Sequence, residues 1–259
     1  HDGVLQDLLI DPIKDAPRPN AIYRAKTTQP MKGQSGIILD LGQGQKGFLK
    51  QARGIASGAT LLVQVTTHAE PGKAAPVVNK LLFKSRYAIV TPNAPGINIA
   101  RGIKDEEEQL RLREIAHDAL DGAPADCGLI LRSACEGASD DDIYADITAM
   151  LDGAGNVLSD ASGAPELLLD APDAAEAAWV NWADADEIVA DEGCFETLGI
   201  WDHIHALENP ECPLSGGASM VIEPTRALVA VDVNTGSDFS LTAGLKANLA
   251  TAKDLPRQL

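Results

Sequence analysis

The sequence lacks the features that mark membrane, secreted and disordered proteins. No stretch approaches the roughly 18–20 consecutive apolar residues of a membrane-spanning helix, and no charged segment followed by an apolar one opens the chain as a secretion signal. Hydrophobic residues make up 45% of the 259, too many for a disordered tail. We expect a cytoplasmic globular protein. Because the chain starts at His1 rather than at methionine, we also expect an N-terminal piece to precede it.

Cysteine is scarce as well. The four cysteines include no CxxC pair and have no histidine at ligand spacing; they are Cys127, Cys135, Cys194 and Cys212. This pattern indicates neither a zinc site nor a disulfide framework. We interpret the four as buried or incidental thiols.

Positive charge is the third shortage, with 21 Lys and Arg against 38 Asp and Glu and a net charge of −17. The net charge of the whole chain argues against a nucleic-acid partner, because phosphate binding relies on Lys and Arg. The charge is unevenly placed: residues 1–113 hold 16 basic and 10 acidic residues, whereas residues 114–259 hold 5 and 28. The first part could therefore meet a polyanion, and the second would need bound cations for a phosphate-related task. Two ordinary solvated faces are the alternative.

The length suggests two domains, or one with an insertion. Residues 20–82 predict a small β-barrel or sandwich, because short β-type segments alternate there with Gly, Pro, Gln and Lys. The expected strands are Ala21–Lys26, Gly36–Leu41, Lys46–Lys50, Thr60–Thr67 and Pro76–Phe83.

An α/β pattern follows. The carboxylates of Asp105–Glu108 suit the N-terminus of a helix that continues to Leu120. The apolar run Cys127–Ser133 predicts a buried strand, and Ser139 is an N-cap signal for a helix through Leu151. Helices and strands that alternate in this way predict an α/β body.

Residues 153–165 are rich in Gly, Ala, Ser and Asp, and are a candidate boundary. The elements expected beyond them are a strand Glu166–Leu169, an Ala-rich helix with Trp179 and Trp182, a strand Glu187–Ala190, a helix from Leu198 to Leu207, a hairpin of Ala218–Glu223 and Ala227–Val233, and a helix Leu241–Leu259 broken or kinked near Pro256.

Two motifs look functional and are rejected. Gly42, Gly44 and Gly47 match GxGxxG, but the dinucleotide fingerprint needs a helix after it, and the following residues are strand-like. We predict a β-turn. His203 and His205 stand two residues apart on a predicted helix, so they face different sides, and we interpret them as structural.

The strongest local signal is Asp232 and Asn234 at the end of an apolar strand. Residues two apart share one face of a strand, and Gly236 lets the chain turn after them. Oxygen ligands at such a place suit Mg²⁺. An Asp/Asn pair that merely starts a turn is the alternative, and spacing alone favours it.

Several segments, taken in order, resemble the ribonuclease E/G family of bacterial endoribonucleases, and the chain is similar to a short, divergent member. The matching segments are Ala21–Lys26, Gly47–Leu49, Tyr87–Asn93, Gly128–Ser133, Leu214–Gly217, Asp232 with Asn234, Asn248–Ala250 and Arg257–Leu259. No single segment is specific, but the ordered set is.

The resemblance implies an RNase H-like domain with an inserted S1-type oligonucleotide-binding barrel, followed by part of a DNase I-like domain. On this reading residues 1–20 and 83–160 form the RNase H-like domain with a 5′-phosphate sensor. Residues 21–82 form the barrel, and residues 161–259 form an incomplete DNase I-like catalytic domain.

The resemblance also implies Mg²⁺-dependent cleavage of single-stranded RNA, with a preference for 5′-monophosphate ends, in RNA processing and turnover. Asp232 matches the family's first metal-binding aspartate, and Asn234 the asparagine that orients it. Arg132 and Ser133 match the Arg-Thr pair that grips the 5′-phosphate, a task that suits a guanidinium and a hydroxyl.

In the barrel, Phe48 and Lys73 match RNA-contacting positions, an aromatic ring for stacking and a cation for phosphate. The chain departs from the family at Ile38, where a second aromatic is expected, and at Thr67, where a lysine is expected. Arg226 stands where Glu is common. We therefore expect a weaker grip on RNA in the barrel.

The family's second metal-binding aspartate would lie beyond Leu259, as would any zinc-linking cysteines. We therefore expect this chain to be a fragment that can be inactive alone, and the full-length protein to self-associate. A non-catalytic RNA-binding module and an unrelated metal-dependent phosphohydrolase are the alternative functions.

Overall fold

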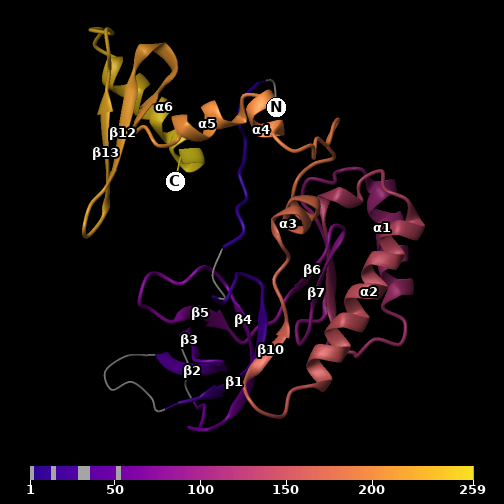
Figure 1. Ribbon diagram of the computed structural model, residues 1–259. Coiled ribbons are helices and arrows are strands. Elements are labelled where there is room, and N and C mark those ends of the chain that lie inside the picture. Colours follow the sequence, from indigo (N-terminus) through magenta and orange to yellow (C-terminus); the bar gives the residue numbers. More distant parts are fainter. Residues whose placement is uncertain (1–2, 13–15, 29–35, 51–53, 259) are drawn as a thin grey trace. The chain divides into compact units, whose positions relative to one another are not determined.

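The computed structural model describes residues 3–12, 16–28, 36–50 and 54–258. The chain divides into two compact units, which are described separately (Figure 1). The first unit is Leu9–Ala185, and the second combines His1–Leu8 with Asp186–Leu259. No helix of the described part is long and apolar enough to span a membrane.

Five strands of the first unit close into a β-barrel. They are β1 (Ile22–Thr27), β2 (Gly36–Gly42), β3 (Gln45–Lys50), β4 (Thr60–Val65) and β5 (Ala75–Val78). The strand order β1-β2-β3-β5-β4 returns to β1, with β3 and β5 parallel and the other pairs antiparallel. Alternate side chains such as Ile37, Leu39 and Leu41 fill the interior. The predicted barrel is confirmed. Gly42 and Gly44 of the GxGxxG match lie at the tight β2–β3 turn, and Gly47 lies within β3.

The predicted strand 76–83 is interrupted. Gln64 explains the break, because its side chain donates to Leu82 O (2.8 Å) and accepts from Leu82 N (2.9 Å) in place of a neighbouring strand. Leu81 and Phe83 then enter a different core from Val77. The chain thus leaves the barrel after β5 and starts a new sheet.

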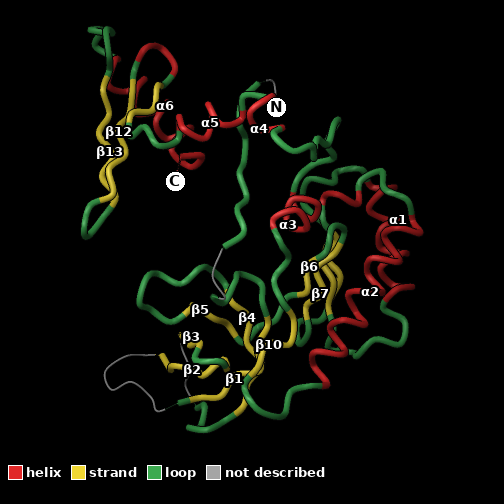
Figure 2. The backbone as a smooth tube through the Cα atoms, in the orientation of Figure 1, coloured by secondary structure: helices red, strands yellow, loops and turns green. Residues whose placement is uncertain are grey.

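A second sheet carries two helices on one face (Figure 2). Its order is β6-β7-β9-β8, with only β8 and β9 parallel. The elements are β6 (Phe83–Lys84), β7 (Ala88–Thr91), β8 (Gly96–Ile99), α1 (Glu106–Ala119), β9 (Gly128–Leu131) and α2 (Asp140–Ser159). The side chain of Ser139 caps α2, which confirms the predicted N-cap, and α1 begins at the predicted acidic run with the Asp105 side chain as its cap. The mixed α/β body is therefore confirmed.

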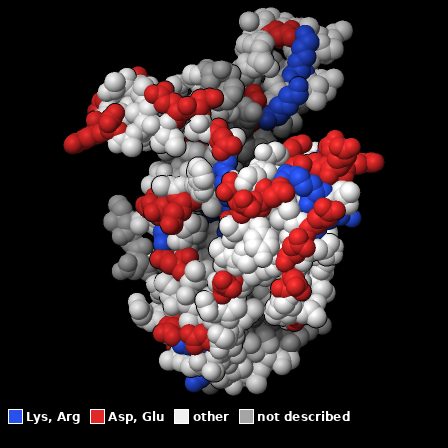
Figure 3. Space-filling view, turned by 90° about the vertical axis from the view of Figure 1, so that its right-hand side faces the viewer, with Lys and Arg blue, Asp and Glu red and all other residues white. Residues whose placement is uncertain are grey.

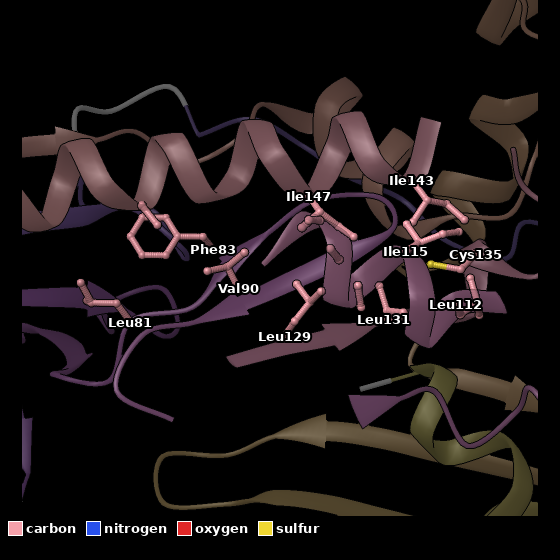
Figure 4. Packing of buried hydrophobic residues seen from close by; sticks show 14 of the residues in the cluster. Leu81, Phe83, Val90, Leu112, Ile115, Leu129, Leu131, Cys135, Ile143 and Ile147 are labelled. Atoms are coloured by element: carbon pink, nitrogen blue, oxygen red, sulfur yellow. The ribbon is translucent and has the colours of Figure 1, made fainter. Parts of the chain in front are cut away.

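The core of this layer lies between α1, α2 and the sheet. Figure 4 shows Ile143 and Ile147 of α2 pointing toward the strands that carry Val90 and Leu129. Ile22 of β1 belongs to the same cluster. The barrel and the α/β layer therefore share buried surface and form one unit.

The Gly/Ala-rich stretch after residue 153 is not a break in the structure, because α2 continues to Ser159 with Ala154 and Val157 buried. Strand β10 (Glu166–Leu169) then pairs with β1, and α3 (Ala174–Asn181) follows. Residues 161–185 thus pack within the first unit, and the contacts divide after Ala185. The domain limits implied by the family resemblance stay a prediction.

The second unit is a three-stranded antiparallel sheet with a helix on it. Its elements are α4 (Cys194–Thr197), α5 (Ile200–Ala206), β11 (Glu211–Pro213), β12 (Ser219–Pro224), β13 (Val229–Asn234) and α6 (Ala243–Gln258). The β12–β13 hairpin confirms the prediction, and α6 packs Ala247 and Ala250 against Met220. Helix α6 runs through Pro256, and its predicted end at Leu259 lies outside the described residues.

The predicted strand Glu187–Ala190 is wrong. These residues are exposed and pair with no strand of the described part. The two apolar residues Ile188 and Val189 favour a strand locally, but a strand forms only where a neighbour satisfies its backbone.

Candidate functional site

Asp232 and Asn234 lie on the exposed face of β13. The Asn234 amide Nδ2 donates to Asp232 Oδ2 at 3.2 Å. Gly236 follows with φ +62°, and a Cβ there would meet the carbonyl oxygen of Gly217 at 1.9 Å. Only glycine therefore lets the turn after the pair pack against the loop that precedes β12.

The donor set at Asp232 fits a hard cation in part. Mg²⁺ is commonly held by one or two carboxylates together with waters and phosphate oxygens. Asp232 offers one carboxylate, and among the described residues no group of three or more His, Cys, Asp or Glu could hold a metal ion. His203 and His205 are exposed on α5, and the His205 ring stacks on Trp201 with centroids 6.1 Å apart. The described residues thus supply one carboxylate of such a site, that of Asp232.

A groove of about 1120 Å³ runs along the barrel. Phe48 and Lys73 both line it, and so do Ile38 and Thr67, the two departures from the family pattern. Ile38 and Phe48 are direct cross-strand partners on β2 and β3. The structure thus brings together all four barrel positions named from the sequence.

Gly36 sets the position of the Phe48 ring. A Cβ at residue 36 would lie 2.5 Å from the ring atoms Cε2 and Cζ. Real Cβ contacts are longer than this, so any larger residue would displace the ring from its half-buried place in the groove. The need for glycine at this position cannot be read from the sequence.

Cations predominate around the groove. Lys50 and Lys80 line it together with Lys73, whose ammonium pairs with the exposed carboxylate of Glu70. His68 is also exposed on its wall. Sequence reasoning missed Lys50, although it lies two residues after Phe48 on the same face of β3. It also missed Lys80 and His68, which reach the groove only through the closure of the barrel.

Arg132 follows β9 and turns its guanidinium toward backbone carbonyls. Nη1 donates to the carbonyl oxygens of Ser85, Arg86 (3.1 Å) and Val180 (2.8 Å). Burial, and then the neighbouring charge of Arg86, lower the pKa of Arg132. Ser133 is exposed at the start of a short 3-10 helix, Ser133–Cys135, and its hydroxyl has no hydrogen bond to a described residue.

Arg86 fastens α3 to the sheet. Its buried guanidinium lies 4.6 Å from the centroid of the Trp179 ring and donates to the carbonyl oxygen of the same residue. It also forms an ion pair with Asp184. The end of α3 is thereby held beside Arg132.

One side of this unit is acidic. Figure 3 shows carboxylates spread over the side that carries α1 and α2. Both helices begin with three consecutive acidic residues, Glu106–Glu108 and Asp140–Asp142. A polyanion would be repelled from this side, so the barrel groove and the Arg132 region are the places suited to one.

Comparison with known proteins gives consistent matches. A model of the ribonuclease E/G family matches residues 83–194 and 185–259. Ribonuclease E of Nostoc sp. is 27% identical over 246 residues, which cover 79% of this chain and 35% of that protein. Ribonuclease G of Escherichia coli (strain K12) is 21% identical over 320 aligned positions, covering 98% of this chain and 64% of that protein. The chain thus spans about a third of the length of the Nostoc ribonuclease E.

Proposed function

The chain belongs to the ribonuclease E/G family, and we propose that the intact protein is a Mg²⁺-dependent endoribonuclease. It cleaves single-stranded RNA, favours 5′-monophosphorylated ends and acts in RNA processing and turnover. The observation that carries this proposal is the family match over residues 83–259, which contain Arg132, Ser133, Asp232 and Asn234. The barrel precedes the matched residues and adds a cationic groove with an aromatic wall.

On this proposal the barrel is an S1-type oligonucleotide-binding module, the α/β layer is RNase H-like and the second unit is part of a DNase I-like domain. The closed barrel of five strands supports its assignment as an oligonucleotide-binding module, because oligonucleotide-binding folds are five-stranded barrels. Phe48 stacks on a base, and Lys50, Lys73 and Lys80 hold phosphates along the strand.

Arg132 and Ser133 bind the 5′-phosphate. Backbone carbonyls hold Nη1 of Arg132, so the guanidinium is oriented before the ligand arrives. Nη2 makes a long hydrogen bond of 3.3 Å to Asn181 Oδ1, which a phosphate oxygen can replace. Ser133 adds an exposed hydroxyl from the next residue. A 5′-hydroxyl end offers no charge to this site and binds less tightly.

Asp232 holds the ion at the cleavage site, and Asn234 fixes the carboxylate by donating to Oδ2. The carboxylate of Asp232 is the group that would hold Mg²⁺ there, since Mg²⁺ in proteins is commonly bound through one or two carboxylates and keeps several waters. A bound Mg²⁺ activates water and stabilises charge on the scissile phosphate.

The proposal is tested in the intact protein by Asp232→Asn, which keeps the shape and removes the charge. We expect cleavage to be lost and RNA affinity to be unchanged, because other residues bind the RNA. Glu223→Gln is the matched control, since Glu223 is an exposed carboxylate on the same hairpin, and it should cleave normally. Full cleavage by the Asp232 variant would refute the assignment. RNA binding without cleavage by the unmodified protein would instead identify a non-catalytic RNA-binding module.

A further inference from the structure

Two cations converge on one neutral oxygen at the end of α3. Lys84 Nζ donates to Asn181 Oδ1 at 2.5 Å, and Arg132 Nη2 donates to the same atom at 3.3 Å. Lys84 lies on β6 and Arg132 follows β9, so the fold of the sheet brings them to one place. Lysine and arginine are both phosphate-binding side chains, so a phosphate oxygen could take the place of this amide oxygen.

The shared oxygen is positioned by other contacts. Asn181 Nδ2 donates to the carbonyl oxygen of Ala177 at 2.8 Å, which directs Oδ1 away from the helix. The cation–π contact and hydrogen bonds between Arg86 and Trp179 fix the last turn of α3. The amide oxygen thus reaches Lys84 and Arg132 because α3 is fastened there.

The positive charges of Lys84 and Arg132 are not balanced by a carboxylate of the described residues. Burial and the charge of Arg132 lower the pKa of Lys84. Burial and the charge of Arg86 in turn lower the pKa of Arg132. No ion pair joins Lys84 or Arg132 to a carboxylate among the described residues. Asp146 acts on Arg132 through space, but its Oδ2 already accepts from Ser85 Oγ (2.5 Å) and Tyr87 N (3.0 Å). An amide dipole offsets like charges far less than an anion would.

We propose that Lys84 is a second phosphate-binding cation beside Arg132, and that Asn181 Oδ1 holds the place of a phosphate oxygen until the RNA end binds. This inference rests on the proposed function, whose 5′-phosphate site it completes. A terminal phosphate carries nearly two negative charges and three acceptor oxygens. It displaces the Asn181 amide and accepts from Lys84 Nζ and Arg132 Nη2, while Nη1 keeps its carbonyl partners. Lys84 is therefore a specificity-determining residue for the 5′ end.

The test measures the affinity of the intact protein for two RNAs of one sequence, with a 5′-monophosphate or a 5′-hydroxyl, by fluorescence anisotropy without Mg²⁺. The readout is the ratio of the two dissociation constants. Lys84→Gln should reduce the preference for the monophosphate about tenfold, as expected for one charge-assisted hydrogen bond. Lys84→Arg should keep the preference. Asn181→Ala should tighten binding of the monophosphorylated RNA alone, because the competing oxygen is gone.

Lys80→Gln is the control, since Lys80 is an exposed lysine on the barrel groove. This variant should bind both RNAs less tightly to the same extent and leave the ratio of their dissociation constants unchanged. Thermal melting checks that each variant folds. This inference is overturned if Lys84→Gln keeps the preference of the unmodified protein for the monophosphorylated RNA while Arg132→Ala loses it. That result leaves the proposed 5′-phosphate site standing. An Asn181→Ala variant that loses the preference overturns the stand-in role of the amide. An unmodified protein with no preference refutes the proposed 5′-phosphate preference itself.

Discussion

Removal of the Arg24 side chain should destabilise the first unit. This side chain is 5% exposed in the barrel strand β1 and reaches the segment that joins α2 to β10. Nε donates to the carbonyl oxygen of Ala164 at 2.7 Å, and Nη1 to that of Asp160 at 2.9 Å. Ion pairs with Asp160 and Glu166 complete its contacts. One guanidinium therefore ties the barrel to the end of the α/β layer.

We expect Arg24→Met to lower the free energy of unfolding of this unit by about 2–3 kcal/mol. Removing one partner of a fully buried pair costs roughly 3–5 kcal/mol, but the carboxylates of Asp160 and Glu166 are 55% and 54% exposed and rehydrate once unpaired. The remaining cost comes from the two carbonyls and from the lost packing.

Urea unfolding followed by circular dichroism measures the change for Arg24→Met. Lys26→Met on the same strand is the control, because Lys26 is exposed. Arg24→Lys should fall between the two, since an ammonium cannot make the forked contacts of a guanidinium. A loss below about 0.5 kcal/mol for Arg24→Met, the size of an ordinary surface substitution, would refute the account of this joint.

Two further predictions concern the groove and the pH dependence of stability. Gly36→Ala should displace the Phe48 ring and weaken RNA binding several-fold by anisotropy, whereas Gly102→Ala, where an added Cβ meets nothing within 4 Å, should bind normally; equal affinities would contradict the stacking role. The Arg111 guanidinium lowers the pKa of Glu108 below the ordinary 4.5, so this pair stabilises the fold above that pH, and its contribution is lost as the pH falls through the lower, folded-state pKa. Thermal melts from pH 6 to pH 3 should show a smaller acid loss in Glu108→Gln, and an unchanged pH profile would contradict this assignment.

The barrel and the helices were predictable because their signals are local. Strands β1 to β4 are short segments of β type separated by Gly, Pro, Gln and Lys. The acidic run from Asp105 and the N-cap residue Ser139 mark the two helix starts by their own chemistry. The second sheet was harder, because β7 and β8 have four residues each and pair with a strand more than 30 residues further along the chain. Such short segments carry too little periodicity to stand out.

The residues of the candidate site also differ in how far the sequence alone could predict them. The same-face placement of Asp232 and Asn234 follows from strand geometry and could be derived from spacing. Arg132 was found only through the family resemblance, and its partners could not be found at all. Lys84 and Asn181 are separated by 97 positions and meet through the docking of α3. Contacts of that range depend on packing, which no local pattern encodes.

The central claim is that the intact protein cleaves RNA, and one measurement tests it most directly. A labelled, A/U-rich single-stranded RNA with a 5′-monophosphate is incubated with the intact protein, with and without Mg²⁺, beside the same RNA with a 5′-hydroxyl. Internal cleavage that requires Mg²⁺ and is faster for the monophosphorylated RNA is the predicted result. RNA that is bound but remains uncut at every Mg²⁺ concentration would contradict the claim.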